Sequence, residues 1–268
     1  MHAALTLRGR RYAYLDIGTG PPLLLFHGWS GASDNFTMWL PSLADRFRLV
    51  IPDLPGCAGA PTLDEPHTAA AYARFGHERA ASCGLGPLAG GGLCSGASIA
   101  MVYAAAYQNE TTALLLHTPF IHPGVIRRRM RIQLRLLATP AGRLYDVLRR
   151  SAVLSRVYRR FTDGGDVATA EESRNARNLV VADGRAAREL AVDLLRGDHR
   201  ALLRSWSRPL FVIVAEGDAF VASAVVRREL AALAPAARLA VIEGGHGWTP
   251  AYIERQSAAL VAAAGAIA

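Results

Sequence analysis

Lysine is missing from this sequence of 268 residues, so all 30 basic residues are arginine. Charged residues are also sparse at 19%, whereas hydrophobic residues reach 51%. A chain with so much apolar and so little charged side chain can bury a sizeable core, which excludes wholesale disorder. The length suits one large domain, or one domain that carries an inserted lobe.

Cysteine is scarce as well, with only Cys57, Cys83 and Cys94 in the chain. Their odd number and their spacing argue against a disulfide framework or a cysteine metal site, and they favour a reducing compartment. No apolar run approaches the ~18 to 20 residues of a membrane-spanning helix. The first residues lack the apolar segment of a signal peptide. We therefore predict a cytoplasmic protein with no membrane partner, in which Cys57 and Cys83 are structural.

The net charge of +8 is concentrated in one part of the chain. Residues 120–204 contain 18 basic and 9 acidic residues, a net charge of +9, and the rest contains 12 basic and 13 acidic residues, a net charge of −1. Solvated helix faces are one explanation, and a basic lobe that attracts an acidic partner or an anionic substrate is another. A nucleic-acid partner is not predicted, because the arginines are not interleaved with aromatics and no recognition motif accompanies them.

Short apolar runs alternate with helix-like segments over most of the chain. Such alternation predicts a mostly parallel sheet with helices on both faces, the α/β class. The expected strands are 12–17, 23–27, 47–52, 88–93, 113–117, 210–215 and 239–242. The expected helices are 34–44, 68–82, 96–107, 221–233 and 251–263.

The alternation is interrupted once, between about residues 119 and 207. This stretch has no strand-like run, and its apolar residues recur near helical spacing with arginines elsewhere around the turn. We therefore predict a core domain made of residues 1–119 and 205–268. Residues 120–204 are predicted to form an arginine-rich helical insertion.

A candidate nucleophile follows the strand expected at 88–93. The sequence Gly92-Leu93-Cys94-Ser95-Gly96 matches a sharp strand-to-helix turn, which strains the central residue and needs small residues two positions away on each side. The backbone N–H of Ser95 and the N-terminus of the next helix then favour both a thiolate and a developing oxyanion. The alternative is a glycine-rich turn around a buried cysteine. No phosphate- or dinucleotide-binding pattern continues from these glycines.

A second candidate element is the His27-Gly28 pair directly after the strand expected at 23–27. A glycine at this point lets the backbone N–H of Trp29 face the nucleophile and complete an oxyanion hole. For His27 itself we expect a structural hydrogen-bonding role.

Two later strands end in loops that carry an acid and a histidine. Asp218 follows the strand expected at 210–215, with Glu216 as a competing acid, and His246 lies between glycines after the strand expected at 239–242. The carboxyl ends of parallel strands are where ligands bind in such sheets. The order Cys94, Asp218, His246 is that of nucleophile, acid and base in this architecture.

With these segments the chain resembles the α/β-hydrolase superfamily over nearly its whole length, at residues 23–31, 50–59, 90–100, 211–218 and 244–246. The resemblance implies a helical cap formed by residues 120–204 over the site. It also implies a nucleophile at Cys94, a base at His246, an orienting acid at Asp218, and oxyanion donors at Trp29 and Ser95.

Three positions depart from the usual pattern of that superfamily. Cys94 stands where most members have serine, and Gly56-Cys57-Ala58-Gly59 replaces the usual G-H-G loop. His117 stands where several members carry an aspartate, sometimes as the alternative acid, and no role is assigned to it. From their positions alone, we expect Trp29, Phe120 and Trp248 to shape the substrate pocket.

A cysteine nucleophile suits acyl exchange, because an acyl-cysteine stays as activated as an incoming thioester. The chain is similar in this respect to carrier-protein thioesterases and cyclases and to dienelactone hydrolase-like enzymes. We predict an enzyme that processes a small-molecule acyl ester or thioester, releasing or cyclising a chain from an acyl carrier protein docked at the basic cap. A simple esterase or lactone hydrolase and a non-catalytic binding protein stay open as alternatives. No metal or organic cofactor is predicted.

Overall fold

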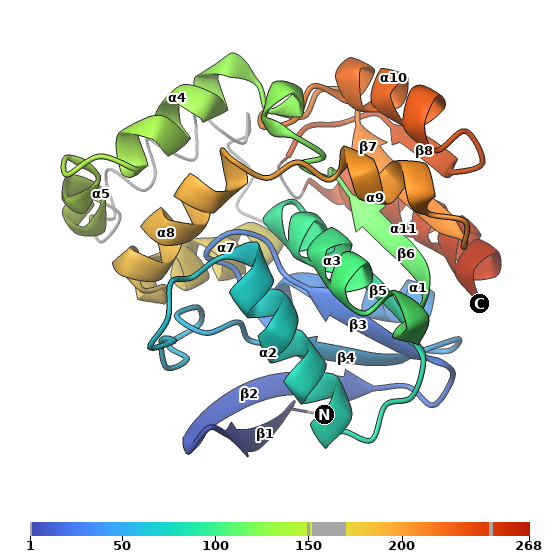
Figure 1. The fold of residues 1–268 in the computed structure, drawn as a ribbon, viewed down its shortest axis with the longest axis horizontal. Helices are drawn as coiled ribbons and strands as arrows, with labels where there is room; N and C mark the ends of the chain where they lie inside the picture. The colour runs from blue at the N-terminus through green and yellow to red at the C-terminus, as the bar shows by residue number, and fades with distance from the viewer. Residues whose placement is uncertain (1, 149–150, 152–169, 247–248) are drawn as a thin grey trace.

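An eight-stranded sheet lies at the centre of the computed structural model, which describes residues 2–148, 151, 170–246 and 249–268 (Figure 1). The strand order is β1-β2-β4-β3-β5-β6-β7-β8. The strands are β1 (His2–Leu7), β2 (Arg10–Ile17), β3 (Pro22–Phe26), β4 (Arg48–Pro52), β5 (Leu88–Leu93), β6 (Thr111–His117), β7 (Leu210–Ala215) and β8 (Arg238–Ile242). Only the β1–β2 and β2–β4 pairs are antiparallel. This mostly parallel sheet confirms the predicted α/β class.

Helices cover both faces of the sheet, so its strands are buried on both sides. One face carries α2 (Ala69–Ser82), α3 (Ser95–Ala106) and α10 (Ser223–Leu233), and the other carries α1 (Leu40–Leu43) and α11 (Pro250–Ile267) (Figure 1). The buried side chains form two hydrophobic clusters, one against each set of helices. Among the described residues, none of the helices combines the length and apolarity that a bilayer crossing needs.

Strand β1 was not predicted from the sequence. It pairs with β2 through the two-residue turn Arg8-Gly9, in which both residues have positive φ (49° and 73°). A turn of this kind matches the twist of a hairpin. Leu5 and Leu7 are half-buried while Thr6 between them is exposed. The segment is therefore a strand of alternating character, which a search for continuous apolar runs does not detect.

The single helix expected at 34–44 is wrong. The structure has a 3₁₀ turn η1 (Ser33–Phe36) and then the short α1 (Leu40–Leu43), with Pro41 in the first turn of α1. Proline has no N–H to donate to the residue four positions earlier, and it disfavours helical geometry in the residue before it. A continuous helix through Pro41 is therefore disfavoured, although the apolar spacing suits one.

The chain between β6 and β7 contains helices, and its described residues form no strand of the sheet. These elements are η3 (Pro123–Val125), α4 (Arg128–Leu137), α5 (Gly142–Leu148), α7 (Ala170–Val181), α8 (Gly184–Leu194) and α9 (Arg200–Ser205). Figure 1 shows α4, α5, α7 and α8 grouped on the same side of the molecule. The division into a core domain and a cap at 120–204 stays a prediction.

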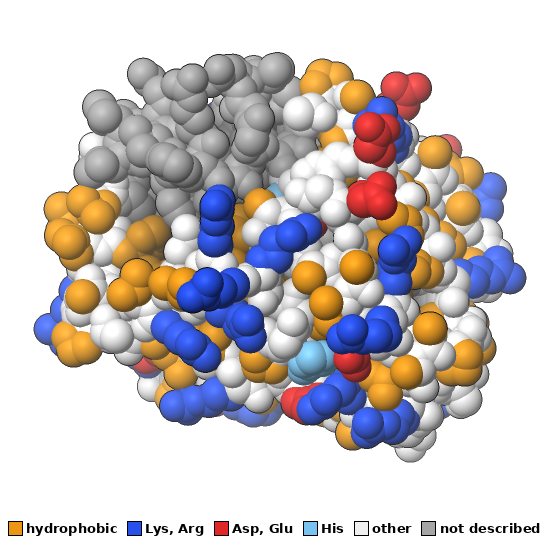
Figure 2. Space-filling model, turned by 90° about the horizontal axis from the view of Figure 1, so that it is seen from above, with side chains coloured by type: hydrophobic (Ala, Val, Ile, Leu, Met, Phe, Trp, Pro, Cys, Tyr) orange, Lys and Arg blue, Asp and Glu red, His pale blue; other side chains and the backbone are white. Residues whose placement is uncertain are grey.

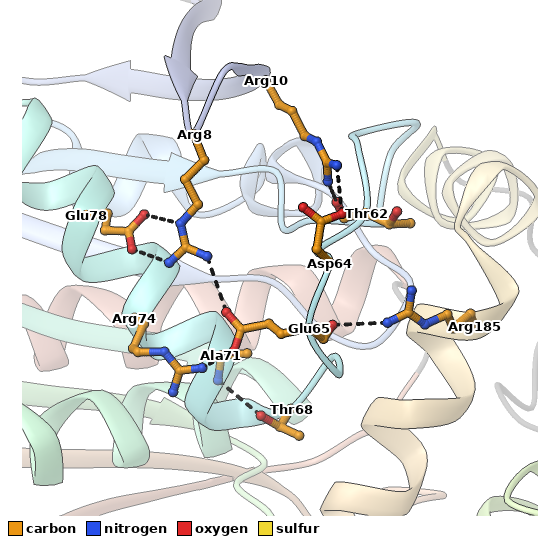
Figure 3. Close-up of polar contacts among 10 residues, drawn as sticks. All are labelled: Arg8, Arg10, Thr62, Asp64, Glu65, Thr68, Ala71, Arg74, Glu78 and Arg185. Carbon is orange, nitrogen blue, oxygen red and sulfur yellow. Dashed lines mark hydrogen bonds and ion pairs between the residues drawn. The ribbon is translucent and has the colours of Figure 1, made fainter.

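A group of ion pairs joins the β1–β2 hairpin, the loop before α2 and helix α2 itself (Figure 3). Arg8 binds Glu78 and Glu65, and Arg10 binds Asp64 at 2.7 Å. Arg74 adds a second contact to the Glu65 carboxylate, and Arg185 of α8 donates to the Glu65 backbone carbonyl at 3.2 Å. Single exposed ion pairs stabilise a fold little. Glu65 nevertheless ties the loop at 61–67 to three elements, to the hairpin and α2 through its carboxylate and to α8 through its backbone carbonyl.

Candidate active site

Cys94 is the single residue between strand β5 and helix α3. Its backbone has φ 55° and ψ −116°, a combination that non-glycine residues rarely adopt. The backbone N–H of Cys94 donates to the carbonyl of His117 at the end of the neighbouring strand β6, at 2.9 Å. The half-buried side chain therefore projects from a sharp turn whose backbone is held by the next strand. This is the strained strand-to-helix turn that the G-x-C-x-G pattern predicts.

Glycine is required on both sides of this turn because backbones approach closely there. A Cβ on Gly92 would lie 2.4 Å from the carbonyl carbon and oxygen of Gly96. A Cβ on Gly96 would lie 2.0 Å from the carbonyl oxygen of Phe26. Both distances are far below van der Waals contact, and the obstructing atoms are backbone. The two glycines thus let α3 pass directly beside β3 and β5.

The strained backbone of Cys94 leads to a stability prediction. Neither Cys94→Gly nor Cys94→Ala retains the thiol, but glycine adopts positive φ without a steric penalty. Release of the strain is expected to make Cys94→Gly more stable than Cys94→Ala by about 1 kcal/mol, even though glycine also loses more entropy on folding. Urea denaturation of the two variants measures the difference. A more stable alanine variant would mean that the backbone at this turn is not strained.

Asp218 and His246 form an ion pair at the carboxyl ends of β7 and β8. The Nδ1 atom of His246 lies 2.8 Å from Oδ2 of Asp218, whose side chain is only 1% exposed. The other carboxylate oxygen accepts the backbone N–H groups of Phe220 and Val221, each at 2.7 Å. The carboxylate therefore has three hydrogen-bond partners, and one of them is the imidazole of His246. Glu216, the competing acid, is exposed.

The two partners shift each other's ionisation. Burial by itself would lower the pKa of His246, but the Asp218 carboxylate and a hydrogen bond to Cys94 raise it well above its usual value. Burial likewise works to raise the pKa of Asp218, but His246 and the two backbone N–H groups lower it below its usual value. Asp218 is thus a carboxylate at neutral pH.

The Cys94 thiol lies close enough to the same imidazole to contribute to its raised pKa. Because Nδ1 of His246 binds Asp218, Nε2 is the ring nitrogen left for the thiol. The structure therefore brings together the three residues that the sequence selected, Cys94, His246 and Asp218. Their catalytic roles stay predictions, which the geometry supports.

Two residues at this site have no counterpart in the sequence analysis. The ring of Phe220 packs edge-on against His246, with centroids 4.1 Å apart and an angle of 84° between the planes. Arg127, just before α4, donates from Nε to the backbone carbonyl of Asp218 at 2.6 Å and from its backbone N–H to the carbonyl of Phe220 at 2.8 Å. No local motif marks either residue, because both contacts depend on the path of the chain between β6 and β7.

Trp29 and Ser95, the expected oxyanion donors, belong to the two backbone segments that lie beside Cys94. Ser95 follows Cys94 as the first residue of α3, and Gly28 approaches Cys94 so closely that a Cβ on it would lie 3.6 Å from the Cys94 Cβ. Within the described part of the chain, no acceptor takes a hydrogen bond from the backbone N–H of Trp29 or Ser95. Both amides thus stay available for an anionic oxygen. Their role as donors stays a prediction.

His27 makes the hydrogen bonds expected of a structural histidine. Its Nε2 accepts the backbone N–H of Leu54 at 3.0 Å, so Nδ1 carries the proton and donates to the carbonyl of Gly28 at 2.9 Å. The ring is fully buried, and burial lowers its pKa. A neutral His27 therefore links the loop before Trp29 to the loop after β4.

His117, which had no role from the sequence, is the centre of a buried polar cluster beneath Cys94. Its Nδ1 lies 3.0 Å from Oγ1 of Thr118, and its Nε2 lies 3.0 Å from the Tyr252 hydroxyl and 2.8 Å from Nε2 of Gln256. Burial lowers the pKa of His117 to about 3, so the ring is neutral at ordinary pH. A neutral ring fits beside the Asp218–His246 pair without adding a charge.

The three residues expected to shape the substrate pocket have different surroundings. Trp29 is half-buried, and its side chain contacts α5 and α8. Phe120 is 4% exposed within the larger hydrophobic cluster, and its carbonyl accepts a hydrogen bond from the Ser98 hydroxyl. Trp248 lies outside the described residues. A role in substrate binding stays a prediction for all three.

In the described part of the chain, no group of three or more His, Cys, Asp or Glu residues is placed to hold a metal ion.

Comparison with known proteins agrees with the fold. Residues 21–248 match the family model described as alpha/beta hydrolase fold. The chain is 29% identical over 245 residues to a pimeloyl-[acyl-carrier protein] methyl ester esterase of Xanthomonas campestris, covering 85% of this chain and 88% of the esterase. It is 38% identical to Lipase 3 of a Moraxella species over 107 residues, which cover 39% of this chain but only 34% of the lipase.

A solved structure of a bromoperoxidase from Bacillus anthracis superposes with a TM-score of 0.82 at 18% identity, covering 98% of this chain and 99% of the bromoperoxidase. At such low identity this similarity shows the fold alone. The family model, by contrast, extends over most of the chain. The chain therefore belongs to the alpha/beta hydrolase fold family.

Proposed function

We propose that the chain cleaves acyl esters or thioesters through a covalent acyl-Cys94 intermediate, with His246 as the base and Asp218 as its orienting acid. One observation carries the proposal: Cys94 lies in a strained turn, close enough to His246 to raise its pKa, and Nδ1 of that imidazole binds a buried carboxylate. Nucleophile, base and orienting acid in mutual hydrogen-bond contact are the arrangement that activates a nucleophile. The esterase and lipase relatives favour the broader class of ester hydrolysis.

The first half-reaction forms the acyl-enzyme. His246 takes the thiol proton on Nε2, and the thiolate of Cys94 attacks the acyl carbon. The carbonyl oxygen becomes an oxyanion, for which the N–H groups of Trp29 and Ser95 are the candidate donors. Loss of one such donor costs about 3 to 4 kcal/mol in known enzymes. The intermediate then collapses: the bond to the leaving alcohol or thiol breaks, and His246 returns the proton to it.

The second half-reaction transfers the acyl group to an acceptor. His246 now takes a proton from the acceptor, which attacks the acyl-Cys94 carbon and releases the thiol. With water as the acceptor, the product is a carboxylic acid. With a hydroxyl, amine or carbon nucleophile of the acyl chain itself as the acceptor, the product is a ring. A thiolate is a good leaving group, so the acyl-cysteine stays reactive towards either kind of acceptor. This chemistry supports chain release or cyclisation as the finer proposal, beside simple ester or lactone hydrolysis.

An acyl carrier protein is the proposed macromolecular partner. Helix α4 presents the exposed side chains of Arg128, Arg129 and Arg135. On the same helix, Ile132 is 45% and Leu136 is 57% exposed. Figure 2 shows arginine side chains spread over the face of the molecule that it presents, with acidic side chains in only a few places. A basic face with exposed apolar side chains suits an acidic helical protein, and the name of the Xanthomonas esterase includes a carrier-linked substrate.

The test is intact mass spectrometry after exposure to acyl-N-acetylcysteamine thioesters of several chain lengths. The wild type is expected to gain one acyl group, and Cys94→Ala is expected to gain none. Cys94→Ala retains Cys57 and Cys83, so it also controls for non-specific acylation of thiols. Delivery of the same acyl group on a carrier protein is expected to acylate Cys94 faster than the small thioester does.

Each contrary outcome has a defined meaning. Equal acylation of wild type and Cys94→Ala would show that the thiol of Cys94 is not the nucleophile. Turnover of p-nitrophenyl esters without thioester chemistry would favour the simple esterase or lactone hydrolase. No adduct and no consumption of any thioester or ester would leave a binding protein on the same fold as the better explanation.

A further inference from the structure

The side chain of Trp29 is held by two helices of the segment between β6 and β7. Its indole Nε1–H donates to the backbone carbonyl of Ala187 on α8 at 2.9 Å. Its ring stacks on Tyr145 of α5, with centroids 5.6 Å apart and 27° between the planes. Trp29 is also the residue whose backbone N–H is the proposed oxyanion donor. One residue thus connects α5 and α8 to the position where negative charge would develop.

Helix α8 is a fixed reference for this contact because it is tied to the core at several points. The backbone N–H of Asp183, at its start, donates to the carbonyl of Gly56 at 2.6 Å. Farther along, Glu189 accepts the backbone N–H of His67 at 2.8 Å, and Asp193 accepts that of Ala69 at 2.7 Å. Three loops and helix ends of the core therefore determine where α8 lies, independently of Trp29.

Helix α5 is in turn attached to α8. The two helices pack against each other, and Figure 1 shows them side by side. Asp146 of α5 forms an ion pair with Arg188 of α8. Tyr145, the residue that stacks on Trp29, is the neighbour of Asp146 in the chain. The indole therefore contacts one assembly of two helices, and not two independent surfaces.

Besides its indole contacts, Trp29 is restrained through the peptide unit that joins it to Gly28, because the Gly28 carbonyl accepts the Nδ1–H of His27 at 2.9 Å. Gly28 precedes it without a side chain, and Ser30 follows it with a positive φ of 53°. Gly31 closes the turn with a hydrogen bond to the carbonyl of Gly28 at 3.0 Å. Rotation of the peptide unit between Gly28 and Trp29 would turn the Trp29 N–H away from Cys94. The two hydrogen bonds to the Gly28 carbonyl resist that rotation directly, and the indole contacts add to them because they fix the far end of the Trp29 side chain.

From these contacts we propose that Trp29 is a positioning residue whose indole aligns the oxyanion donor with Cys94 only while α5 and α8 are docked. This inference rests on the proposed function, since it concerns the oxyanion of the acylation step. An alignment of this kind acts mainly in the transition state, where the oxygen is charged. Loss of the alignment should therefore lower the rate of acylation and leave substrate binding nearly unchanged.

Two reagents separate the oxyanion step from the reactivity of the thiol. Acylation by an acyl-N-acetylcysteamine thioester passes through an oxyanion, whereas alkylation by iodoacetamide is a displacement at carbon in which no oxyanion forms. Both reactions require the same Cys94 thiol and the same His246. At saturating thioester, the ratio of the two rates at Cys94 therefore separates the oxyanion step from the reactivity of the thiol.

Trp29→Phe is the variant that tests the inference, because phenylalanine retains an aromatic ring for Tyr145 but has no N–H for Ala187. We expect acylation of Cys94 to be about 10-fold slower than in the wild type. This loss is smaller than the 10²- to 10³-fold loss that follows complete removal of an oxyanion donor, because the backbone N–H of Trp29 is still present. The rate of alkylation by iodoacetamide and KM are expected to stay within about 2-fold of the wild type. Trp206→Phe is the matched control, since the Trp206 Nε1–H binds the carbonyl of Pro209 at 3.4 Å away from the thiol.

Contrary results are distinguishable from failure of the proposed function. Acylation of Trp29→Phe at the wild-type rate would overturn the inference. An equal fall in acylation and alkylation would overturn it as well, because the defect would then lie in the thiol or in the fold. If the wild type itself forms no acyl adduct, the proposed function fails, and the role of Trp29 fails with it.

Discussion

Replacing Asp218 with asparagine is expected to lower kcat for thioester cleavage about 10⁴-fold while the protein stays folded. The carbonyl oxygen of an asparagine can still accept the N–H groups of Phe220 and Val221, which now hold one carboxylate oxygen at 2.7 Å. Its amide nitrogen then faces Nδ1 of His246 and donates a proton to it. This forces the neutral imidazole to carry its own proton on Nε2, so that the ring can no longer accept the proton of Cys94.

The same variant tests the electrostatics of the pair. Because the Asp218 carboxylate raises the pKa of His246, that pKa is expected to fall in Asp218→Asn, as measured by NMR titration of the ring. The lowered pKa of Asp218 stabilises the fold above the pKa of an unfolded aspartate, about 3.9, and this stabilisation disappears as the pH falls through the folded value. The raised pKa of His246 stabilises the fold below about 6.5, and this stabilisation disappears as the pH rises through the folded value.

The free energy of unfolding should therefore differ most between wild type and Asp218→Asn from about pH 4 to 6.5, and less on either side. Urea denaturation across this range measures the difference. Glu216→Gln is the matched control: it neutralises an exposed acid two residues away and should leave kcat, the histidine titration and stability unchanged. If Glu216→Gln lost activity and Asp218→Asn did not, the orienting acid would be Glu216 and the proposed role of Asp218 would be wrong.

The parts of the site that could be predicted from the sequence are those with a local signature. The turn at Cys94 needs Gly92 and Gly96 within two residues, so the pattern is visible in five letters of sequence. Asp218 and His246 each follow a strand whose apolar run is continuous, and the ends of neighbouring parallel strands lie side by side. Strand order and strand ends were thus enough to bring the acid and the base together.

The missing parts depend on contacts between distant residues. Arg127 is 91 residues from Asp218 in the chain, and Trp29 is 158 residues from Ala187. Neither pair has a pattern of spacing or composition that a single sequence reveals. His117 is a similar case, because the partners of its Nε2, Tyr252 and Gln256, come from α11 at the other end of the chain. A buried histidine can be recognised as neutral only when its surroundings are known.

These long-range contacts have a common consequence for the site. Arg127, which lies between β6 and β7, binds the loop of Asp218, and Trp29 in the loop after β3 contacts α5 and α8 of the same segment. The acid loop and the oxyanion loop are therefore positioned from outside the sheet. The sheet supplies the strand ends, and the intervening helices determine how two of the loops are oriented on them.

Adding one methyl group at Gly96 is expected to destabilise the protein by about 3 kcal/mol or more and to abolish acylation of Cys94. A Cβ at this position would lie 2.0 Å from the carbonyl oxygen of Phe26 and 2.5 Å from that of His27. Neither atom belongs to a flexible side chain, so helix α3 and the end of β3 would have to move apart. That movement separates Cys94, at the start of α3, from Trp29, in the loop after β3.

Gly90→Ala is the control, because Gly90 lies on the same buried strand but has room for a side chain. A Cβ on Gly90 would meet the Leu114 Cδ2 atom at 3.5 Å and the Thr111 Cγ2 atom at 3.8 Å, both ordinary contacts. Its stability is expected to stay within about 1 kcal/mol of the wild type. Urea denaturation and the rate of acylation distinguish the two variants. If Gly96→Ala were as stable and as reactive as Gly90→Ala, α3 could not pass against the carbonyls of β3, and the oxyanion site between Trp29 and Ser95 would lose its structural basis.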